Sequence, residues 1–384
     1  MAKILFVTNI AGSKMKVDFC KGALNAANAL NIDFCAVANR NKSTSEQIRE
    51  DEHTYGVSLL HADISRSPFS KSNIRAYKQI VKWIKQENID YIHCNTPVGG
   101  ILGRLAGKKC KVKKVIYQVH GFHFYKGAPK KNWLLYYPVE KWLAHYTDAI
   151  ITINQEDYQL AKSKFKLRNR GEVYYVPGVG IDTTQFNNNE MSRDDKRSEL
   201  NIPLDAFVLI SVGELNVNKN NGVIVSALEQ LKRDNVHYVL CGVGELELSI
   251  REQVEKAGLS ENVHFLGYRN DVKELYRMAD CFVMPSYREG LSRSIMEAMA
   301  SGLPCVVSKI RGNVDLIKDG VGGFLCDTND VSAYAEKLNL LASDAELRDK
   351  MGKNNLTAVQ KFNTETVTNA MYNIYKTEFN DKLE

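Results

Sequence analysis

The sequence predicts two α/β domains, each a doubly wound, Rossmann-like parallel sheet with helices on both faces, that face each other across a cleft. Three observations indicate this fold class. The chain has 384 residues, which suits two domains of ordinary size. Short β-branched runs alternate with helical patterns along most of it, which is typical of parallel sheets. A polar stretch without apolar periodicity, residues 182–201, interrupts the alternation near the middle.

The first domain is expected to span residues 1–180. Its first residues carry one lysine before a short apolar run with no small-residue cleavage site after it, so we interpret the run as a strand and not a signal peptide. In residues 73–87 the apolar side chains keep helical spacing with lysines opposite, which indicates an amphipathic helix. The expected strands of this domain are 3–10, 34–39, 91–95, 114–120, 149–154 and 173–178.

Residues 181–205 are expected to connect the domains, and residues 206–362 to form the second one. The tail, 363–384, has helical spacing at Val367 and Met371 and is expected to pack back on the first domain. Two doubly wound units joined by a linker place a ligand in the cleft between the carboxyl ends of their strands. The expected strands of the second domain are 207–213, 238–242, 263–267, 281–286, 304–308 and 323–326.

The composition is that of a globular protein whose two halves differ in charge. With 44% hydrophobic and 25% charged residues, the chain falls outside the collagenous, disordered and disulfide-scaffold classes. The net charge is +6, but residues 1–180 hold 28 Lys and Arg against 14 Asp and Glu, a net of +14. A basic half implies an anionic partner, which could be nucleic acid, an acidic lipid surface or a diphosphate-bearing substrate.

The cysteines and the hydropathy pattern indicate where the protein works. The eight cysteines occur singly with no C-x-x-C pair, so they are expected to be buried small hydrophobes in a reducing compartment, the cytoplasm. No segment has 18 consecutive apolar residues, so no membrane-spanning helix is expected.

The segment 285–308, PSYREGLSRSIMEAMASGLPCVVS, carries the clearest chemical pattern. A strand is expected to end at Ser286 and a helix to begin near Ser292, a good N-cap. Glu289 lies in the loop between them and Glu297 about one and a half turns into the helix, so two carboxylates flank a helix N-terminus. Free N–H groups there bind phosphate, and carboxylates suit sugar and ribose hydroxyls. Two arbitrary glutamates would more often be solvated surface residues. The order of the surrounding residues therefore decides whether this pair forms a binding site.

That order resembles a known enzyme family. The string EGLSRSIMEAMASGLPCVVS is similar to the E-x7-E signature of retaining glycosyltransferases of family 4, which have the two-domain GT-B fold. The similarity extends over nearly the whole chain, and the segment 121–158 resembles bacterial members that extend lipid-linked saccharides for capsule, exopolysaccharide or protein glycans. Other segments in family order are VHGFHF from Val119, VPGVGID from Val176, VGELNVNK from Val212, CGVGE from Cys241 and VHFLGYRNDVKELY from Val263.

The resemblance implies roles for the residues that match. Glu289 would hold hydroxyls of the donor sugar, Glu297 the ribose, and Lys219 the diphosphate. His120, after a strand end, would lie beside the donor's sugar, so Glu289, His120 and Lys219 are the expected catalytic group. Without the family, Lys219 would be a solvated loop residue and His120 a surface or core histidine. The other expected donor-binding residues are Gly12, Gly213, Gly242, Gly244, Gly267, Tyr268, Arg269, Gly290, Leu291, Ser292 and Arg293.

Three positions depart from expected patterns. Family members often have Arg where this chain has Glu214, so a second cation for the diphosphate must come from elsewhere or be absent. Arg293 is the candidate, and a solvated Arg293 is the alternative. A glycine pair common after the first strand is here Gly12 followed by Ser13. Gly242 and Gly244 lack a third glycine, so they make only a weak NAD fingerprint.

The chemistry implied needs no metal and no cofactor. No D-x-D motif occurs, so lysine, arginine and a helix N-terminus would stabilise the leaving diphosphate in place of a divalent cation. In this family, retention is thought to proceed on one face of the sugar, with the donor's phosphate oxygen taking the acceptor proton. An enzymic nucleophile of the glycosidase type is therefore not expected.

Partners and alternatives follow from the same features. The expected partners are a nucleotide diphosphate sugar, with UDP favoured by the resemblance, a polyprenyl-diphosphate-linked saccharide, and the anionic inner face of the cell membrane. Lysines interleave with aromatics in residues 126–143, which fits that peripheral location or a packed helix. Nucleic acid is not expected, because no reading motif occurs. A nucleotide-sugar epimerase and a non-catalytic membrane-associated protein remain as alternatives.

Overall fold

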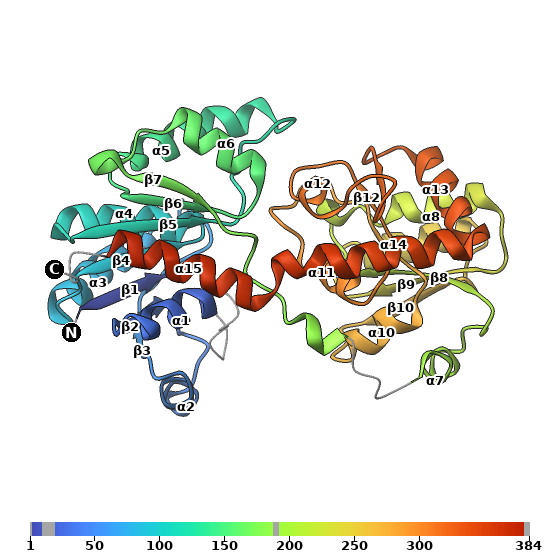
Figure 1. The fold of residues 1–384 in the computed structure, drawn as a ribbon, viewed down its shortest axis with the longest axis horizontal. Coiled ribbons are helices and arrows are strands. Elements are labelled where there is room, and N and C mark those ends of the chain that lie inside the picture. Colours follow the sequence, from blue (N-terminus) through green and yellow to red (C-terminus); the bar gives the residue numbers. More distant parts are fainter. Residues whose placement is uncertain (1, 10–19, 187–191, 380–384) are drawn as a thin grey trace. The chain divides into compact units, whose positions relative to one another are not determined.

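The computed structural model describes residues 2–9, 20–186 and 192–379 (Figure 1). The chain divides into two compact units, one formed by Met1–Gly180 with Thr364–Glu384 and the other by Ile181–Asn363. Each unit is built on a sheet whose strand pairs all run parallel. The predicted fold class, two doubly wound α/β domains, is confirmed.

The first unit has a seven-stranded sheet in the order β3-β2-β1-β4-β5-β6-β7, so the strand order reverses between β1 and β4. Its strands are β1 (Lys3–Val7), β2 (Asp33–Ala38), β3 (Ser58–His61), β4 (Tyr91–Asn95), β5 (Lys114–Val119), β6 (Ala149–Thr152) and β7 (Glu172–Tyr175). Its helices are α1 (Lys21–Ala29), α2 (Ser45–Tyr55), α3 (Ser72–Gln86), α4 (Pro97–Cys110), α5 (Lys130–Ala144), α6 (Gln155–Lys164), the short η2 (Arg168–Arg170) and α15 (Thr364–Glu378).

Two apolar cores cover the two faces of this sheet. The core on one face joins the sheet to α3, α4 and α5, and the core on the other joins it to α1 and α15. Helix α15 comes from the C-terminal end of the chain and packs beside α1 (Figure 1). The buried imidazole of His93 on β4 lies 2.7 Å from the hydroxyl of Tyr375 on α15, so a polar contact accompanies the apolar packing.

The second unit has a six-stranded sheet in the order β10-β9-β8-β11-β12-β13, with its reversal between β8 and β11. Its strands are β8 (Phe207–Val212), β9 (Val236–Cys241), β10 (Val263–Gly267), β11 (Cys281–Met284), β12 (Cys305–Ser308) and β13 (Gly323–Cys326). Its helices are α7 (Arg193–Glu199), α8 (Gly222–Leu231), α9 (Glu247–Lys256), α10 (Val272–Met278), α11 (Arg293–Ala300), α12 (Asn313–Leu316), α13 (Val331–Ser343) and α14 (Ala345–Ala358), with short turns η3 (Thr183–Phe186), η4 (Val217–Lys219) and η5 (Val359–Phe362).

Two features differ from the sequence interpretation. Strand β3 was not predicted, because its four residues, SLLH, show no alternation and it forms the edge of the sheet. The segment 181–205, expected to be a linker, contains α7. The guanidinium of Arg197 on α7 is buried and bonded to Asp280 and to the carbonyl oxygens of Met278, Leu204 and Ala206. Polar contacts of this kind hold the helix in place. Because they do not require regularly spaced apolar residues, the sequence pattern did not predict it.

The cysteines are buried, apart from Cys110, which is partly buried. Among the described residues, none of the helices combines the length and the hydropathy needed to cross a bilayer.

Candidate active site

The candidate site lies in the second unit, where the strand order reverses between β8 and β11. Ligands of doubly wound sheets bind at this point, beyond the carboxyl ends of the strands. Lys219 follows β8 in the turn η4, and Glu289 follows β11 in the loop before α11. The turn is fixed by Asn216, whose side-chain oxygen accepts a hydrogen bond from the Lys219 N–H at 3.1 Å.

The structure brings Lys219 and Glu289 together, although 70 residues separate them. The Lys219 ammonium lies 2.8 Å from a carboxylate oxygen of Glu289, and both side chains are largely buried. Gly213, at the end of β8, has a φ of +153°, and a Cβ there would lie 3.2 Å from the Lys219 Cε. The glycine therefore leaves room for the lysine stem to cross the strand end.

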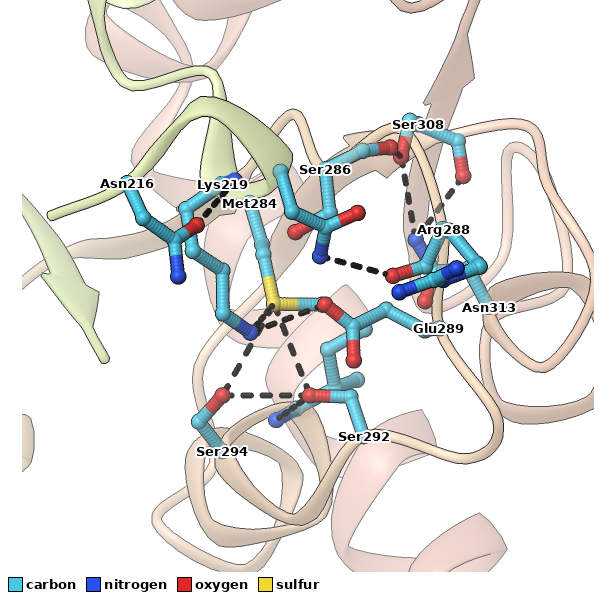
Figure 2. A network of polar contacts seen from close by, with 12 residues as sticks. Asn216, Lys219, Met284, Ser286, Arg288, Glu289, Ser292, Ser294, Ser308 and Asn313 are labelled. Carbon is cyan, nitrogen blue, oxygen red and sulfur yellow. Dashed lines mark hydrogen bonds and ion pairs between the residues drawn. The ribbon is translucent and has the colours of Figure 1, made fainter. Parts of the chain in front are cut away.

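The N-terminus of α11 completes this group of donors (Figure 2). Ser292 is the N-cap, and its hydroxyl accepts from the Ile295 N–H. The hydroxyls of Ser292 and Ser294 and the Lys219 ammonium all lie against the sulfur of Met284, at 3.5, 3.7 and 3.7 Å. A thioether is a weak acceptor, whereas a phosphate oxygen is a strong one. Two hydroxyls, an ammonium and a helix N-terminus therefore converge where an anion is favoured.

Glu297 lies on α11 within a polar cluster of its own. Its carboxylate accepts from the Arg293 guanidinium at 2.9 Å and from the Tyr276 hydroxyl at 3.1 Å. Burial holds the pKa of Tyr276 well above its usual range, so this phenol remains a hydrogen-bond donor. The Arg293 side chain is half exposed and forms an ion pair with Glu297.

Glycines shape the ends of the strands next to β8. Gly242, after β9, has a φ of +152°, and a Cβ there would lie 1.8 Å from the carbonyl oxygen of Gly213. A Cβ on Gly244 would lie 2.2 Å from the carbonyl oxygen of Leu215. Only glycine permits these close approaches of one main chain to another. The main chain at these strand ends is therefore closely packed and partly buried.

The end of β10 presents an aromatic ring and a paired cation. Tyr268 is 77% exposed, directly after Gly267. The Arg269 guanidinium bonds to Asp271 and, at 3.1 Å, to Glu199 on α7. These two carboxylates raise the pKa of Arg269, and Arg269 lowers that of Asp271. The arginine side chain is therefore tied to this unit's own carboxylates.

His120 lies in the first unit, directly after β5. Burial lowers the pKa of its imidazole to about 4, so the ring is neutral near pH 7. The following residues are held by α6, because the Phe122 N–H donates to the Asp157 carboxylate at 3.1 Å. Gly12, predicted from the same half of the sequence, lies outside the described residues.

Comparisons with known proteins show which family the chain belongs to. Residues 3–154 match the family described as Glycosyl transferase 4-like, and residues 192–357 match Glycosyl transferases group 1. The chain is 39% identical to the putative glycosyltransferase EpsD of Bacillus subtilis over 317 residues, which cover 81% of this chain and 83% of the relative. The chain belongs to the family 4 glycosyltransferases.

Two further proteins illustrate the range of the family. The chain is 29% identical to an Escherichia coli enzyme named UDP-Gal:alpha-D-GlcNAc-diphosphoundecaprenol alpha-1,3-galactosyltransferase, with 84% of this chain and 83% of the relative covered. The crystal structure of Anabaena Alr3699/HepE in complex with UDP and glucose superposes with a TM-score of 0.78 at 20% identity, covering 98% of this chain and all of that one. This structural similarity shows that the glycosyltransferase has the GT-B fold.

The structure also reveals residues near the site that the sequence interpretation did not consider. Arg311, in the turn after β12, donates from its Nε to the main-chain oxygen of Glu289 at 3.3 Å. Met284, at the end of β11, lies under the converging donors (Figure 2). The only sequence signal for Arg311 was its place at the carboxyl end of the next strand, where doubly wound folds gather ligand-binding residues.

Proposed function

We propose that this glycosyltransferase moves a hexose or an N-acetylhexosamine, with retention of configuration, from a UDP-sugar to a saccharide carried on a polyprenyl diphosphate, in the synthesis of a cell-surface polysaccharide or glycan. The observation that carries the proposal is the meeting of Lys219, Glu289 and the N-terminus of α11 at the strand reversal of the second unit. This set offers a cation and N–H groups for a diphosphate and a carboxylate for sugar hydroxyls.

The donor's diphosphate binds Lys219, the hydroxyls of Ser292 and Ser294, and the first turn of α11. Phosphate oxygens replace the weak sulfur acceptor that these donors contact in the structure. Arg293 is the second cation in this assignment, and it reaches the diphosphate by leaving Glu297. Glu297 holds the ribose hydroxyls while Tyr276 keeps its carboxylate oriented.

In this proposal, Glu289 binds the hydroxyls of the donor sugar. When the diphosphate takes Lys219, the Glu289 carboxylate is released to accept hydrogen bonds from sugar hydroxyls. A neutral imidazole, which the lowered pKa of His120 provides, suits an uncharged sugar because it can both donate and accept. Tyr268 and the glycine turns at Gly242, Gly244 and Gly267 receive the nucleotide base.

The chemical step exchanges one bond at the anomeric carbon for another. The bond from this carbon to the diphosphate oxygen breaks while the bond to the acceptor oxygen forms on the same face. The acceptor's proton moves to the departing phosphate oxygen, so no protein nucleophile takes part. The charge that builds up on the diphosphate is stabilised by Lys219 and the dipole of α11. The E. coli relative's name records an α-1,3 linkage, which corresponds to retention if its donor sugar is α-linked.

Metal independence is part of the proposal, since the chain has no D-x-D motif and cationic side chains serve the diphosphate. We expect transfer to continue in excess EDTA at its rate without chelator. Loss of transfer on chelation, with recovery on adding Mn²⁺ or Mg²⁺, would contradict this part while leaving the donor site intact.

The lipid-linked acceptor is supported by the outer face of α5 and by the charge of residues 1–180. Four apolar side chains on this helix are exposed, with Leu134 at 79% and Trp142 at 50%. Exposed lysines flank them: Lys130, Lys131 and Lys141. Aromatic and aliphatic side chains with flanking cations suit the interface of an anionic bilayer. The name of the E. coli relative also specifies a diphosphoundecaprenol substrate.

The experiment that tests the function is a donor screen followed by transfer. UDP-glucose, UDP-galactose, their N-acetylhexosamine counterparts, GDP-mannose and dTDP-glucose are compared for protection from thermal unfolding, because a bound donor stabilises by mass action. The best donor is then incubated with polyprenyl-diphosphate saccharides. We expect one UDP-sugar to protect the protein and to be transferred. Protection by a UDP-sugar that is converted only to its epimer would favour an epimerase instead.

A further inference from the structure

The loop 286–292, which carries Glu289, has a neighbour to which the proposed function gives no role. This neighbour is the turn after β12 formed by Arg311, Gly312 and Asn313, the last of which is the first residue of α12. Arg311 is only 6% exposed and Asn313 is fully buried. Charged and amide side chains are seldom buried unless they bond to specific partners, so the contacts of this turn indicate what it holds.

Each residue of the turn contacts the Glu289 loop in a different way. The Arg311 Nε donates to the main-chain oxygen of Glu289 at 3.3 Å. Gly312 has a φ of +81°, and a Cβ there would lie 2.3 Å from the main-chain oxygen of Gly290. Glycine is therefore needed both for the backbone conformation and for the close approach.

Asn313 acts through one intermediate residue. Its amide nitrogen donates to the main-chain oxygen of Ser308 at 3.0 Å and lies 3.2 Å from the Ser308 hydroxyl. That hydroxyl donates to the main-chain oxygen of Ser286 at 2.6 Å. Asn313 thus fixes the beginning of the Glu289 loop, while Arg311 and Gly312 meet its middle.

The turn that carries Lys219 holds the same loop by separate contacts. The side-chain amide of Asn218 donates to the main-chain oxygen of Arg288 at 2.9 Å, and its main-chain oxygen accepts from the Tyr287 N–H at 2.8 Å. The two turns therefore bond to or closely pack against main-chain groups of four successive residues, 287–290, and Ser308 bonds to Ser286 just before them. The direction in which the Glu289 side chain leaves the loop depends on both.

We infer that the Arg311–Gly312–Asn313 turn positions the Glu289 carboxylate against the donor sugar. These are positioning residues: they act through Glu289 and do not contact the donor. The inference rests on the proposed function, in which Glu289 binds sugar hydroxyls. A shift of about 1 Å in a positioned group can lower a rate by about 100-fold, so small changes in this turn should be felt at the sugar.

Arg311→Ala and Gly312→Ala test the inference, with Arg311→Lys as the conservative variant. The matched control is Arg348→Ala, because Arg348 also donates to main-chain oxygens of the second unit, those of Leu341 and Ala342. Two quantities are measured with the protective UDP-sugar from the donor screen. One is kcat/KM for transfer, and the other is the ratio of the Kd for UDP to the Kd for the UDP-sugar, which reports the contribution of the sugar.

We expect Arg311→Ala and Gly312→Ala to lower kcat/KM by about 100-fold and to bring the Kd ratio close to one. The Kd for UDP alone should stay within about threefold, because the diphosphate and base sites are not altered. Arg311→Lys should recover part of the loss, and Arg348→Ala should match the wild type. Unchanged kcat/KM and Kd ratio in a folded Arg311→Ala variant would overturn the inference even if Gly312→Ala failed to fold.

A double variant separates positioning from a general structural effect. If Arg311 acts through Glu289, adding Arg311→Ala to Glu289→Ala should leave the Kd ratio where Glu289→Ala alone puts it. Effects that multiply in the double variant would overturn the inference and leave the proposed function standing. If Glu289→Ala alone kept both quantities at wild-type values, the sugar-binding role of Glu289 and the inference would fall together.

Discussion

The two units share one architecture but offer ligands different surfaces. In the second unit, polar groups at the strand ends bond to one another around Lys219 and Glu289, and residues 181–363 carry 21 Lys and Arg against 27 Asp and Glu, a net of −6. In the first, α5 presents exposed apolar side chains between lysines, in a half with a net charge of +14. A small diphosphate ligand needs a few converging groups, whereas a bilayer needs area and long-range charge. The proposed function therefore assigns two kinds of recognition to the same sheet topology.

The largest expected effect comes from removing the converging groups of the second unit. Lys219→Ala or Glu289→Ala should lower transfer by about 100- to 1,000-fold, because each removes charge or hydrogen bonding aimed at the reacting donor. Initial rates with the protective UDP-sugar measure this loss. Lys232→Ala is the matched control, since Lys232 is an exposed lysine at the C-cap of α8. Near-normal turnover of Glu289→Ala would remove the candidate site from the second unit.

A smaller effect of opposite sign is expected when only the ion pair of the resting site is weakened. Diphosphate binding must break the 2.8 Å contact between Lys219 and Glu289. Glu289→Gln keeps the shape but removes the negative charge, so UDP alone should bind about tenfold more tightly, which corresponds to about 1.4 kcal/mol. Calorimetric titration of UDP into both proteins measures the difference. Weaker binding of UDP to Glu289→Gln would mean that the carboxylate assists the diphosphate site.

These two predictions concern contacts that the sequence predicted only in part. The alternation of strands and helices predicted both sheets, and the E-x7-E spacing placed Glu289 and Glu297 on either side of a helix N-terminus. The contact between Lys219 and Glu289 could not be predicted, because it depends on how two loops from different strands meet. Arg311 was missed for a similar reason. It bonds to a main-chain oxygen, and such a partner leaves no pattern of complementary side chains in the sequence.

The corresponding test of the first unit removes charge from α5. Lys130→Ala with Lys131→Ala should weaken binding to vesicles containing anionic lipid by about 30-fold, because each lysine near the surface contributes about 1 kcal/mol. Flotation with rising anionic lipid, at low and high salt, measures the change. The control pair, Lys256→Ala with Lys350→Ala, removes two exposed lysines from the second unit and should leave flotation unchanged. Binding indifferent to lipid charge and salt would favour an acceptor that is not bound to a membrane.

The smallest expected effect concerns histidines in both units whose pKa values are lowered by burial. In the second unit His237 on β9 and His264 on β10 lie 3.0 Å apart, and in the first His93 lies close enough to His120 for their charges to interact. Burial lowers the pKa of His264 to about 4, with a further contribution from His237. Burial also lowers the pKa of His237. The charge of Arg197 lowers this pKa further, and the charge of Asp205 raises it. Both units therefore hold neutral imidazoles that avoid protonation in the folded state.

The sign of the pH dependence follows from these shifts. The unfolded chain protonates its histidines near pH 6.5, before the folded units do, so the unfolded state binds more protons as the pH falls from 6.5 towards 4. The contribution of these histidines to the free energy of unfolding is fully present above pH 6.5 and is lost as the pH falls from 6.5 towards 4. His264→Phe removes one such group and should reduce the loss between pH 7 and pH 5 by on the order of 1 kcal/mol. Thermal unfolding monitored across this range measures the slope, and His53→Phe, which alters an exposed histidine, is the control. A slope that His264→Phe leaves unchanged would show that His264 does not contribute to acid sensitivity.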